Sequence, residues 1–220
     1  MKNYIVKKAQ KALGDYPAEP HFTPNYNPWE QRVCLAPDGD LFKAIRSGKA
    51  SVETESISHF TPDGISLESG NNLEADVIIS ATGLNILPLG GVDIFVDDEK
   101  IDLSKLFVYK GCMLNKLPNL FLFVGYTNAS WTLKSDLTSE YISRVLKYMG
   151  KYHFKTICPR VVEKLSPTPL LNLNSGYIHR ANNILPNQGK KAPGRVYQNY
   201  ILDFKMLRMN KINDSSAVFE

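Results

Sequence analysis

The fold class is decided by the stretch Ala75-Asp76-Val77-Ile78-Ile79-Ser80-Ala81-Thr82-Gly83. A short continuous apolar run between a charge and a glycine is typical of a strand buried on both faces of a parallel sheet. The small residues and the glycine that follow would place backbone N–H groups at the carboxyl end of the sheet, where open α/β folds bind ligands. A turn without any function explains the same pattern equally well, because strand-to-turn junctions with glycine are common.

A second apolar run, Leu120-Phe121-Leu122-Phe123-Val124, predicts another buried strand, which ends at Gly125. Polar and aromatic residues follow, and apolar residues at helical spacing then predict a helix from Thr132 to Met149 that is closed by Gly150. The order strand, loop, helix indicates an α/β fold.

The start of that helix is a candidate ligand site, because its first N–H groups are unpaired and lie at the positive end of the helix dipole. This geometry suits an anionic or carbonyl-rich edge of a ligand. The alternative is structural: Ser130 or Thr132 caps the helix, and Trp131 packs in the core.

The rest of the chain predicts short, separate elements. Helical spacing predicts a helix over Lys2–Leu13 that ends at Gly14, and prolines and aromatic residues predict an ordered loop from Tyr16 to Pro37. Residues 38–40 predict a turn and an aspartate N-cap for a helix over residues 41–46. A β-meander is predicted from strands at residues 50–60 and 65–68 and turns at 62–64 and 69–72, and a last amphipathic helix is predicted over residues 197–209.

Arg32 is a candidate functional residue, because an arginine held by a rigid loop of prolines and aromatic residues can present a fixed positive charge to a developing anion. The alternative is a surface arginine paired with Glu30 or Asp40, since exposure is the default for arginine.

Composition excludes several classes of protein. Hydrophobic residues make up 43% and charged residues 22%, as in soluble globular proteins, and the net charge of +4 is spread along the chain, which does not indicate nucleic-acid binding. The three cysteines and four histidines are scattered without metal-ligand spacing, so we expect no metal site and a reducing, cytoplasmic setting. No apolar run reaches the ~20 residues that span a bilayer, so we expect a soluble protein without a membrane span.

Four stretches carry a resemblance to a known family: residues 21–32 (HFTPNYNPWEQR), 38–46 (DGDLFKAIR), 75–83 (ADVIISATG) and 125–134 (GYTNASWTLK). Together they resemble the class B flavoprotein monooxygenases of the Baeyer–Villiger type, and among them the ethionamide-activating branch. The resemblance runs from about Tyr4 to about Asp214 and is most specific around Trp29 and Trp131.

The resemblance implies FAD and NADPH as cofactors. Reduced FAD and O2 would form a C4a-peroxyflavin, which transfers one oxygen atom to a ketone or oxidises a soft sulfur or nitrogen atom of a small-molecule substrate. Arg32 matches the arginine that in this family lies against the flavin, stabilises that anion and then the nicotinamide of NADP+, so it is the expected catalytic residue.

The resemblance also implies cofactor contacts. Ala81, Thr82 and Gly83 would pass near FAD where the chain crosses between domains. Asn128, Thr132 and Leu133 would lie beside the isoalloxazine ring.

This chain departs from the family because it lacks the two glycine-rich motifs that bind the pyrophosphates of FAD and NADPH. We therefore expect a partial α/β fold of two dinucleotide-binding domains, in which residues 1–80 end the NADPH domain and residues 81–220 form the C-terminal part of the FAD domain. Two hypotheses follow. A separate chain supplies the missing parts of a working oxidoreductase, or the polypeptide is a non-enzymatic remnant or interaction module without a cofactor.

Overall fold

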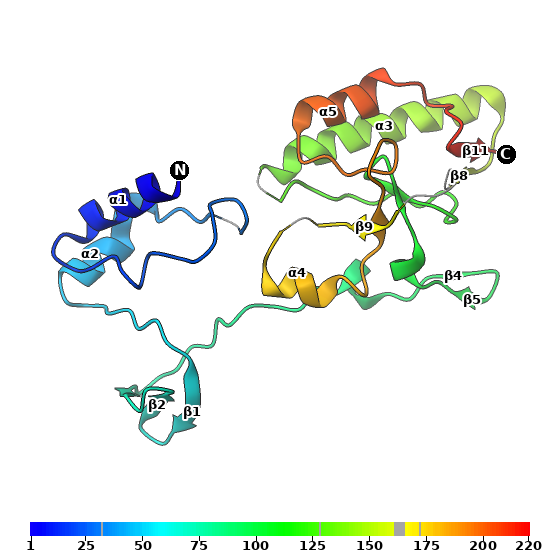
Figure 1. The fold of residues 1–220 in the computed structure, drawn as a ribbon. Coiled ribbons are helices and arrows are strands. Elements are labelled where there is room, and N and C mark those ends of the chain that lie inside the picture. Colours follow the sequence, from blue (N-terminus) through cyan, green and yellow to red (C-terminus); the bar gives the residue numbers. More distant parts are fainter. Residues whose placement is uncertain (32, 128, 161–165, 172) are drawn as a thin grey trace. The chain divides into compact units, whose positions relative to one another are not determined.

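The computed structural model describes residues 1–31, 33–127, 129–160, 166–171 and 173–220. The chain folds into two compact units, one from Met1 to Leu84 and one from Asn85 to Glu220 (Figure 1). The domain boundary predicted from the sequence, between residues 80 and 81, stays a prediction. The assignment of the units to an NADPH and an FAD domain stays a prediction.

Two helices, α1 (Lys2–Leu13) and α2 (Asp40–Arg46), begin the first unit and contact each other. Leu13 and Ile45 are buried together in its small core. The prediction for α1 is confirmed, including its end at Gly14, where a φ of 68° requires the left-handed freedom of glycine. The predicted aspartate N-cap is wrong, because Asp40 is already the first residue of α2.

The predicted meander is present as an antiparallel sheet of three strands, β1 (Ile57–Thr61), β2 (Gly64–Leu67) and β3 (Asn72–Glu74). Its first hairpin turns tightly from Thr61 to Gly64, and a Cβ atom at residue 64 would overlap the carbonyl oxygen of Leu73. Residues 50–56 form no strand, so the prediction of a longer first strand is wrong. They pair with no neighbouring strand, and a strand needs such pairing for its backbone groups.

The buried strand predicted at residues 75–83 is wrong in this structure. The segment forms no strand, and the side chains of Val77 and Ile79 are 76% and 86% exposed. A strand buried on both faces needs strands at its edges and helices over both faces, and the described residues provide neither. The apolar sequence therefore has the composition of an interior strand without the surroundings of one.

The second predicted strand, at residues 120–124, is also wrong. Phe121 makes only an isolated bridge to Met113, and Phe123 is half-exposed. All strand pairs among the described residues are antiparallel, so the expected mixture of helices and strands is present but the predicted parallel sheet is not.

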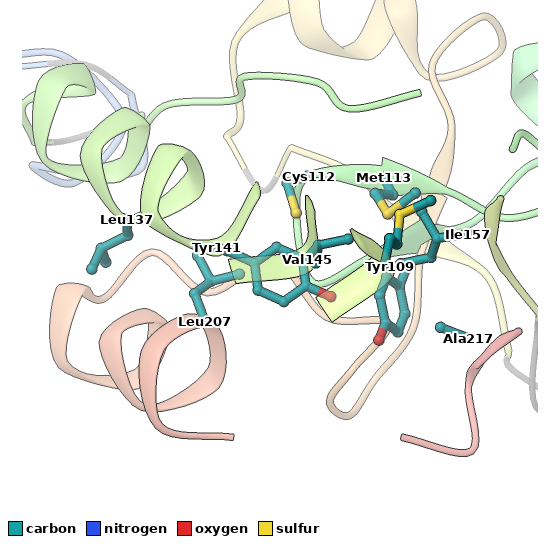
Figure 2. Close-up of a cluster of buried hydrophobic side chains, with 10 residues drawn as sticks. Tyr109, Cys112, Met113, Leu137, Tyr141, Val145, Ile157, Leu207 and Ala217 are labelled. Carbon is teal, nitrogen blue, oxygen red and sulfur yellow. The ribbon is translucent and has the colours of Figure 1, made fainter. Parts of the chain in front are cut away.

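The second unit is organised around helix α3 (Trp131–Tyr152), which lies beside α5 (Tyr200–Phe204) in Figure 1. Leu137, Tyr141 and Val145 lie on its buried side and join one apolar cluster with Leu207, as Figure 2 shows. The spacing predicts this helix, but the helix continues through Gly150 and ends at Tyr152, where His153 caps it with a φ of 59°. The last helix is shorter than predicted, because α5 passes into a π-helical turn over Lys205–Met209.

Short elements complete the second unit. No helix of the described residues is long and apolar enough to cross a membrane. The hairpins and pairs are β4 (Phe95–Val96) with β5 (Glu99–Lys100), β6 (Val108–Tyr109) with β7 (Met113–Leu114), β8 (Ile157–Pro159) with β11 (Ala217–Phe219), and β9 (Thr168–Pro169) with β10 (Asn187–Gln188). The remaining helices are α4 (Gly176–Ala181) and the 3-10 turns Pro37–Gly39, Pro88–Gly91 and Leu103–Lys105.

The buried side of α3 gives a direct test of the core. Leu137 is 1% exposed and Leu146, on the same helix, is 59% exposed. We expect Leu137→Ala to lower the free energy of unfolding by about 2–5 kcal/mol through lost burial and a cavity. Leu146→Ala is the matched control and should change it by less than about 0.5 kcal/mol. Urea titrations followed by circular dichroism measure both, and equal losses would contradict the assigned orientation of α3.

Candidate functional site

The first group of predicted cofactor residues, Ala81, Thr82 and Gly83, lies in the exposed segment that follows the meander. The hydroxyl oxygens of Ser80 and Thr82 are 3.5 Å apart. Gly83 has a φ of 109°, and a Cβ atom there would meet no other atom within 4 Å. These residues are therefore small, exposed and free of packing at their surface, as a backbone that lies along a ligand must be.

The second group lies at the start of α3 in the other unit. Thr132 and Leu133 are exposed on the first turn of the helix. Two predicted site residues, Arg32 and Asn128, lie outside the described residues. The structure thus brings Thr132 and Leu133 together on one helical turn, while Ala81, Thr82 and Gly83 belong to the first unit.

The residues that lead into α3 (125–127, 129 and 130, called here the pre-α3 segment) are held by a close approach of backbone and ring. The indole of Trp131 lies directly on Gly125, and a Cβ atom at that position would overlap the ring. Trp131 is half-exposed, so it does not pack in the core. Ser130 precedes the helix without a capping hydrogen bond from its side chain. The purely structural roles considered for these residues, a helix cap by Ser130 and core packing by Trp131, are therefore not observed.

A glutamine fixes the same segment from another element. The backbone N–H and the hydroxyl of Thr127 both donate to Oε1 of Gln198, at 2.8 and 3.0 Å. Gln198 lies two residues before α5, next to Asn199, whose side chain accepts a hydrogen bond from the N–H of Leu202 and caps that helix. The pre-α3 segment is therefore connected to the start of α5.

A cavity of about 480 Å³ borders this connection, and Gln198 and Asn199 line it. The buried amide of Gln188 forms part of its wall, donating to the carbonyls of Pro169 and Leu170 and accepting from the N–H of Val196. Lys190 and Arg195 add exposed cations to its lining. Cations and amides together suit an anionic or carbonyl-bearing group. Sequence reasoning missed these residues, because isolated amides give no periodic signal.

A buried ion pair lies next to Tyr126 of the pre-α3 segment. Nζ of Lys134 is 2.7 Å from Oδ1 of Asp203, and the two side chains are 1% and 0% exposed. Burial, and then the nearby Asp203 carboxylate, raise the pKa of the Tyr126 phenol. Sequence reasoning missed this pair as well, although Lys134 stands three residues before Leu137 on the apolar side of the predicted helix, which was the available signal.

Cys112, between strands β6 and β7, is buried in the same region. Burial raises the pKa of its thiol to about 12, although the ammonium groups of Lys134 and Lys110 oppose the rise. The thiol therefore stays protonated at neutral pH, which makes it a packed side chain and a poor nucleophile.

Comparisons with known proteins show what the fold and the sequence of this chain are similar to. No protein-family model matches the chain. Crystal structures of OTEMO with FAD bound and in complex with FAD and NADP have a similar fold, with TM-scores of 0.55 and 0.54 at 22% identity. They match 73% of this chain and 32% and 31% of their own chains.

The sequence comparison supports the resemblance: over its whole length this chain is similar to proteins named FAD-containing or FAD-binding monooxygenases. The FAD-containing monooxygenase EthA of Mycolicibacterium smegmatis is 45% identical over 221 residues, and the probable FAD-binding monooxygenase AlmA of Acinetobacter baylyi is 45% identical over 222 residues. Both alignments cover 100% of this chain and 45% of the relative, so the chain spans about half the length of the relatives it matches.

The contact between Gly125 and Trp131 is testable in a Trp29→Phe background, which leaves Trp131 as the single tryptophan. We expect Gly125→Ala to displace the indole and to lower the free energy of unfolding by about 1–3 kcal/mol through overpacking. Gly150→Ala, inside α3 with no atom near its added Cβ, is the control and should raise stability by about 0.5–1 kcal/mol. An unchanged Trp131 emission spectrum in the Gly125→Ala variant would contradict the contact.

Thiol reactivity checks the burial of Cys112. At pH 8 we expect an aromatic disulfide reagent to react rapidly with the exposed Cys34 and to reach Cys112 only after unfolding. The rapid phase should disappear in Cys34→Ser and persist in Cys112→Ser. A rapid phase that depends on Cys112 would show that its thiol is accessible and ionised.

Proposed function

We propose that this chain supplies the C-terminal part of an FAD- and NADPH-dependent monooxygenase, which inserts one oxygen atom of O2 into a ketone or oxidises a soft sulfur or nitrogen atom of a small-molecule substrate. The observation that carries the proposal is the 45% identity to FAD-containing and FAD-binding monooxygenases along the full chain. We place the reaction in the reducing cytoplasm, where the exposed thiol of Cys34 would persist.

Each unit, taken by itself, presents residues that suit contact with a flavin cofactor. Thr132 and Leu133 are exposed on the first turn of a helix of 22 residues, and Ala81, Thr82 and Gly83 are exposed and small. A bound FAD, reduced by NADPH, would supply the activation of O2. In the proposal, the first turn of α3 in the second unit orients the ring. Ala81, Thr82 and Gly83 are proposed cofactor contacts of the first unit, considered by itself.

The same residues do not provide an anchor for the pyrophosphate. Dinucleotide-binding folds hold that group at a glycine-rich turn before a helix, and this sequence has no GxGxxG motif. We therefore propose that the two motifs lie in polypeptide outside these 220 residues, in a second chain or in another part of the same one. Arg32 is the proposed catalytic residue, which would hold its positive charge beside the flavin.

The exposure of Val77 and Ile79 supports this assembly. Their segment has the apolar composition of a strand from the interior of a parallel sheet, and it is uncovered in the first unit. In the proposal, the polypeptide that brings the glycine motifs also brings the sheet that covers these side chains. The second candidate is a remnant or interaction module without cofactor, which the missing motifs favour.

The test is co-expression of the chain with a polypeptide that carries both glycine motifs, followed by desalting and measurement of flavin absorbance. We expect flavin to be retained in the complex, and we expect Val77→Ser/Ile79→Ser to abolish its formation. Ile201→Ser, which changes an equally exposed side chain of α5, is the control and should leave the complex intact. Flavin retained by the chain alone would contradict the proposal that the pyrophosphate anchor lies outside these residues. No flavin in either sample would favour the remnant without cofactor.

A further inference from the structure

The ion pair between Lys134 and Asp203 is not used by any of the cofactor contacts above. Lys134 extends inward from the first turn of α3, and Asp203 extends from α5. Nζ of Lys134 also lies over the ring of Tyr126, 5.8 Å from its centroid. The pair therefore joins both helices to a residue of the pre-α3 segment.

Few other groups satisfy these charges. Among the described residues, Nζ of Lys134 and both carboxylate oxygens of Asp203 have no hydrogen bond of good geometry outside the ion pair, and the nearby hydroxyl of Tyr126 has none either. A Cβ atom at Gly111 would lie 3.4 Å from Nζ of Lys134, so the backbone of Gly111 packs close to the ammonium group. Each charge therefore has the other as its direct ionic partner, and the phenol of Tyr126 lies beside both.

Stability alone does not explain such a pair. The desolvation of two buried ions offsets much of their attraction, and apolar residues of similar volume often give equal or greater stability. What an apolar pair lacks is direction, because dispersion contacts do not fix one atom opposite another. An ion pair can therefore fix the positions of the residues next to it, which an apolar pair would not do.

A closed series of contacts links the pre-α3 segment, α3 and α5. Lys134 binds Asp203, and the N–H of Asp203 donates to the carbonyl of Asn199 at 3.1 Å. Gln198, next to Asn199, accepts both hydrogen bonds of Thr127. Tyr126, which precedes Thr127, lies under the ammonium group of Lys134 and completes the series of contacts. Two links therefore hold this region together: the exposed hydrogen bonds from Thr127 to Gln198, just before α5, and the buried ion pair between Lys134 of α3 and Asp203 of α5.

We propose that Lys134 and Asp203 are positioning residues, whose buried ion pair fixes the rotation of the first turn of α3 and the conformation of the pre-α3 segment. With Lys134 directed inward, Thr132 and Leu133 face solvent and Trp131 stays on Gly125. Only the consequence for flavin rests on the proposed function, because Trp131 reports on the segment without any cofactor.

The experiment uses the Trp29→Phe chain with Lys134→Met, Asp203→Leu and the double variant. Each single variant leaves one buried charge unpaired and should lower the midpoint of unfolding strongly, whereas the double variant should recover most of the loss. Trp131 should nevertheless remain more accessible to acrylamide in the folded double variant than in the parent, with a red-shifted emission.

The control is a second ion pair between α3 and the turn after α5. Nε of Arg208 is 3.2 Å from Oε2 of Glu140, and both side chains are partly exposed. Glu140→Gln/Arg208→Gln should leave the quenching of Trp131 unchanged. Recovery of both stability and quenching in the apolar double variant would overturn the inference, since the pair would then be only a packing element. A double variant that does not fold would overturn it as well, because the pair would then serve folding itself.

Flavin gives an independent measurement in the complex with the polypeptide that carries the glycine motifs. We expect the double variant to form the complex but to lose flavin on desalting and to change the visible circular dichroism of the flavin that remains. If the parent complex binds no flavin, the proposed function fails, while the quenching of Trp131 still decides the role of the pair.

Discussion

Burial of one side of α3 is the interaction on which the second unit depends. The helix presents Leu137, Tyr141 and Val145 to strands β6 and β7 and to the turn that contains Leu207, so segments far apart in sequence share one apolar cluster. The pairing of β8 with β11 closes the end of this cluster with the last residues of the chain. The side of α3 opposite to this cluster is left exposed to solvent.

The sequence predicted those elements whose stability is local. Helix α1, helix α3 and the meander follow from spacing, glycine positions and turns that lie within the elements themselves. The runs at residues 75–80 and 120–124 were assigned as buried strands from composition alone, and they are not strands here. A strand requires neighbours as well as β-forming residues, and neighbours are non-local information that a short pattern cannot contain.

The candidate site shows the same division. Thr132 and Leu133 were predicted at a helix start and are found exposed there, whereas Gln198 and Asp203 were missed. Both missed residues act through partners about 70 positions away, such as Thr127, which lies 71 residues from Gln198. Resemblance to the monooxygenase family predicted which segments lie near a flavin, and that stays a prediction. Only the folded chain shows which contacts hold one of those segments.

The uncovered segment around Val77 and Ile79 has a consequence for the life of the protein in a cell. Extended apolar residues with unpaired backbone groups are recognised by chaperones and proteases, and they associate with one another when concentrated. Until the segment is covered, by other residues of its own polypeptide or by a second chain, quality control competes with assembly.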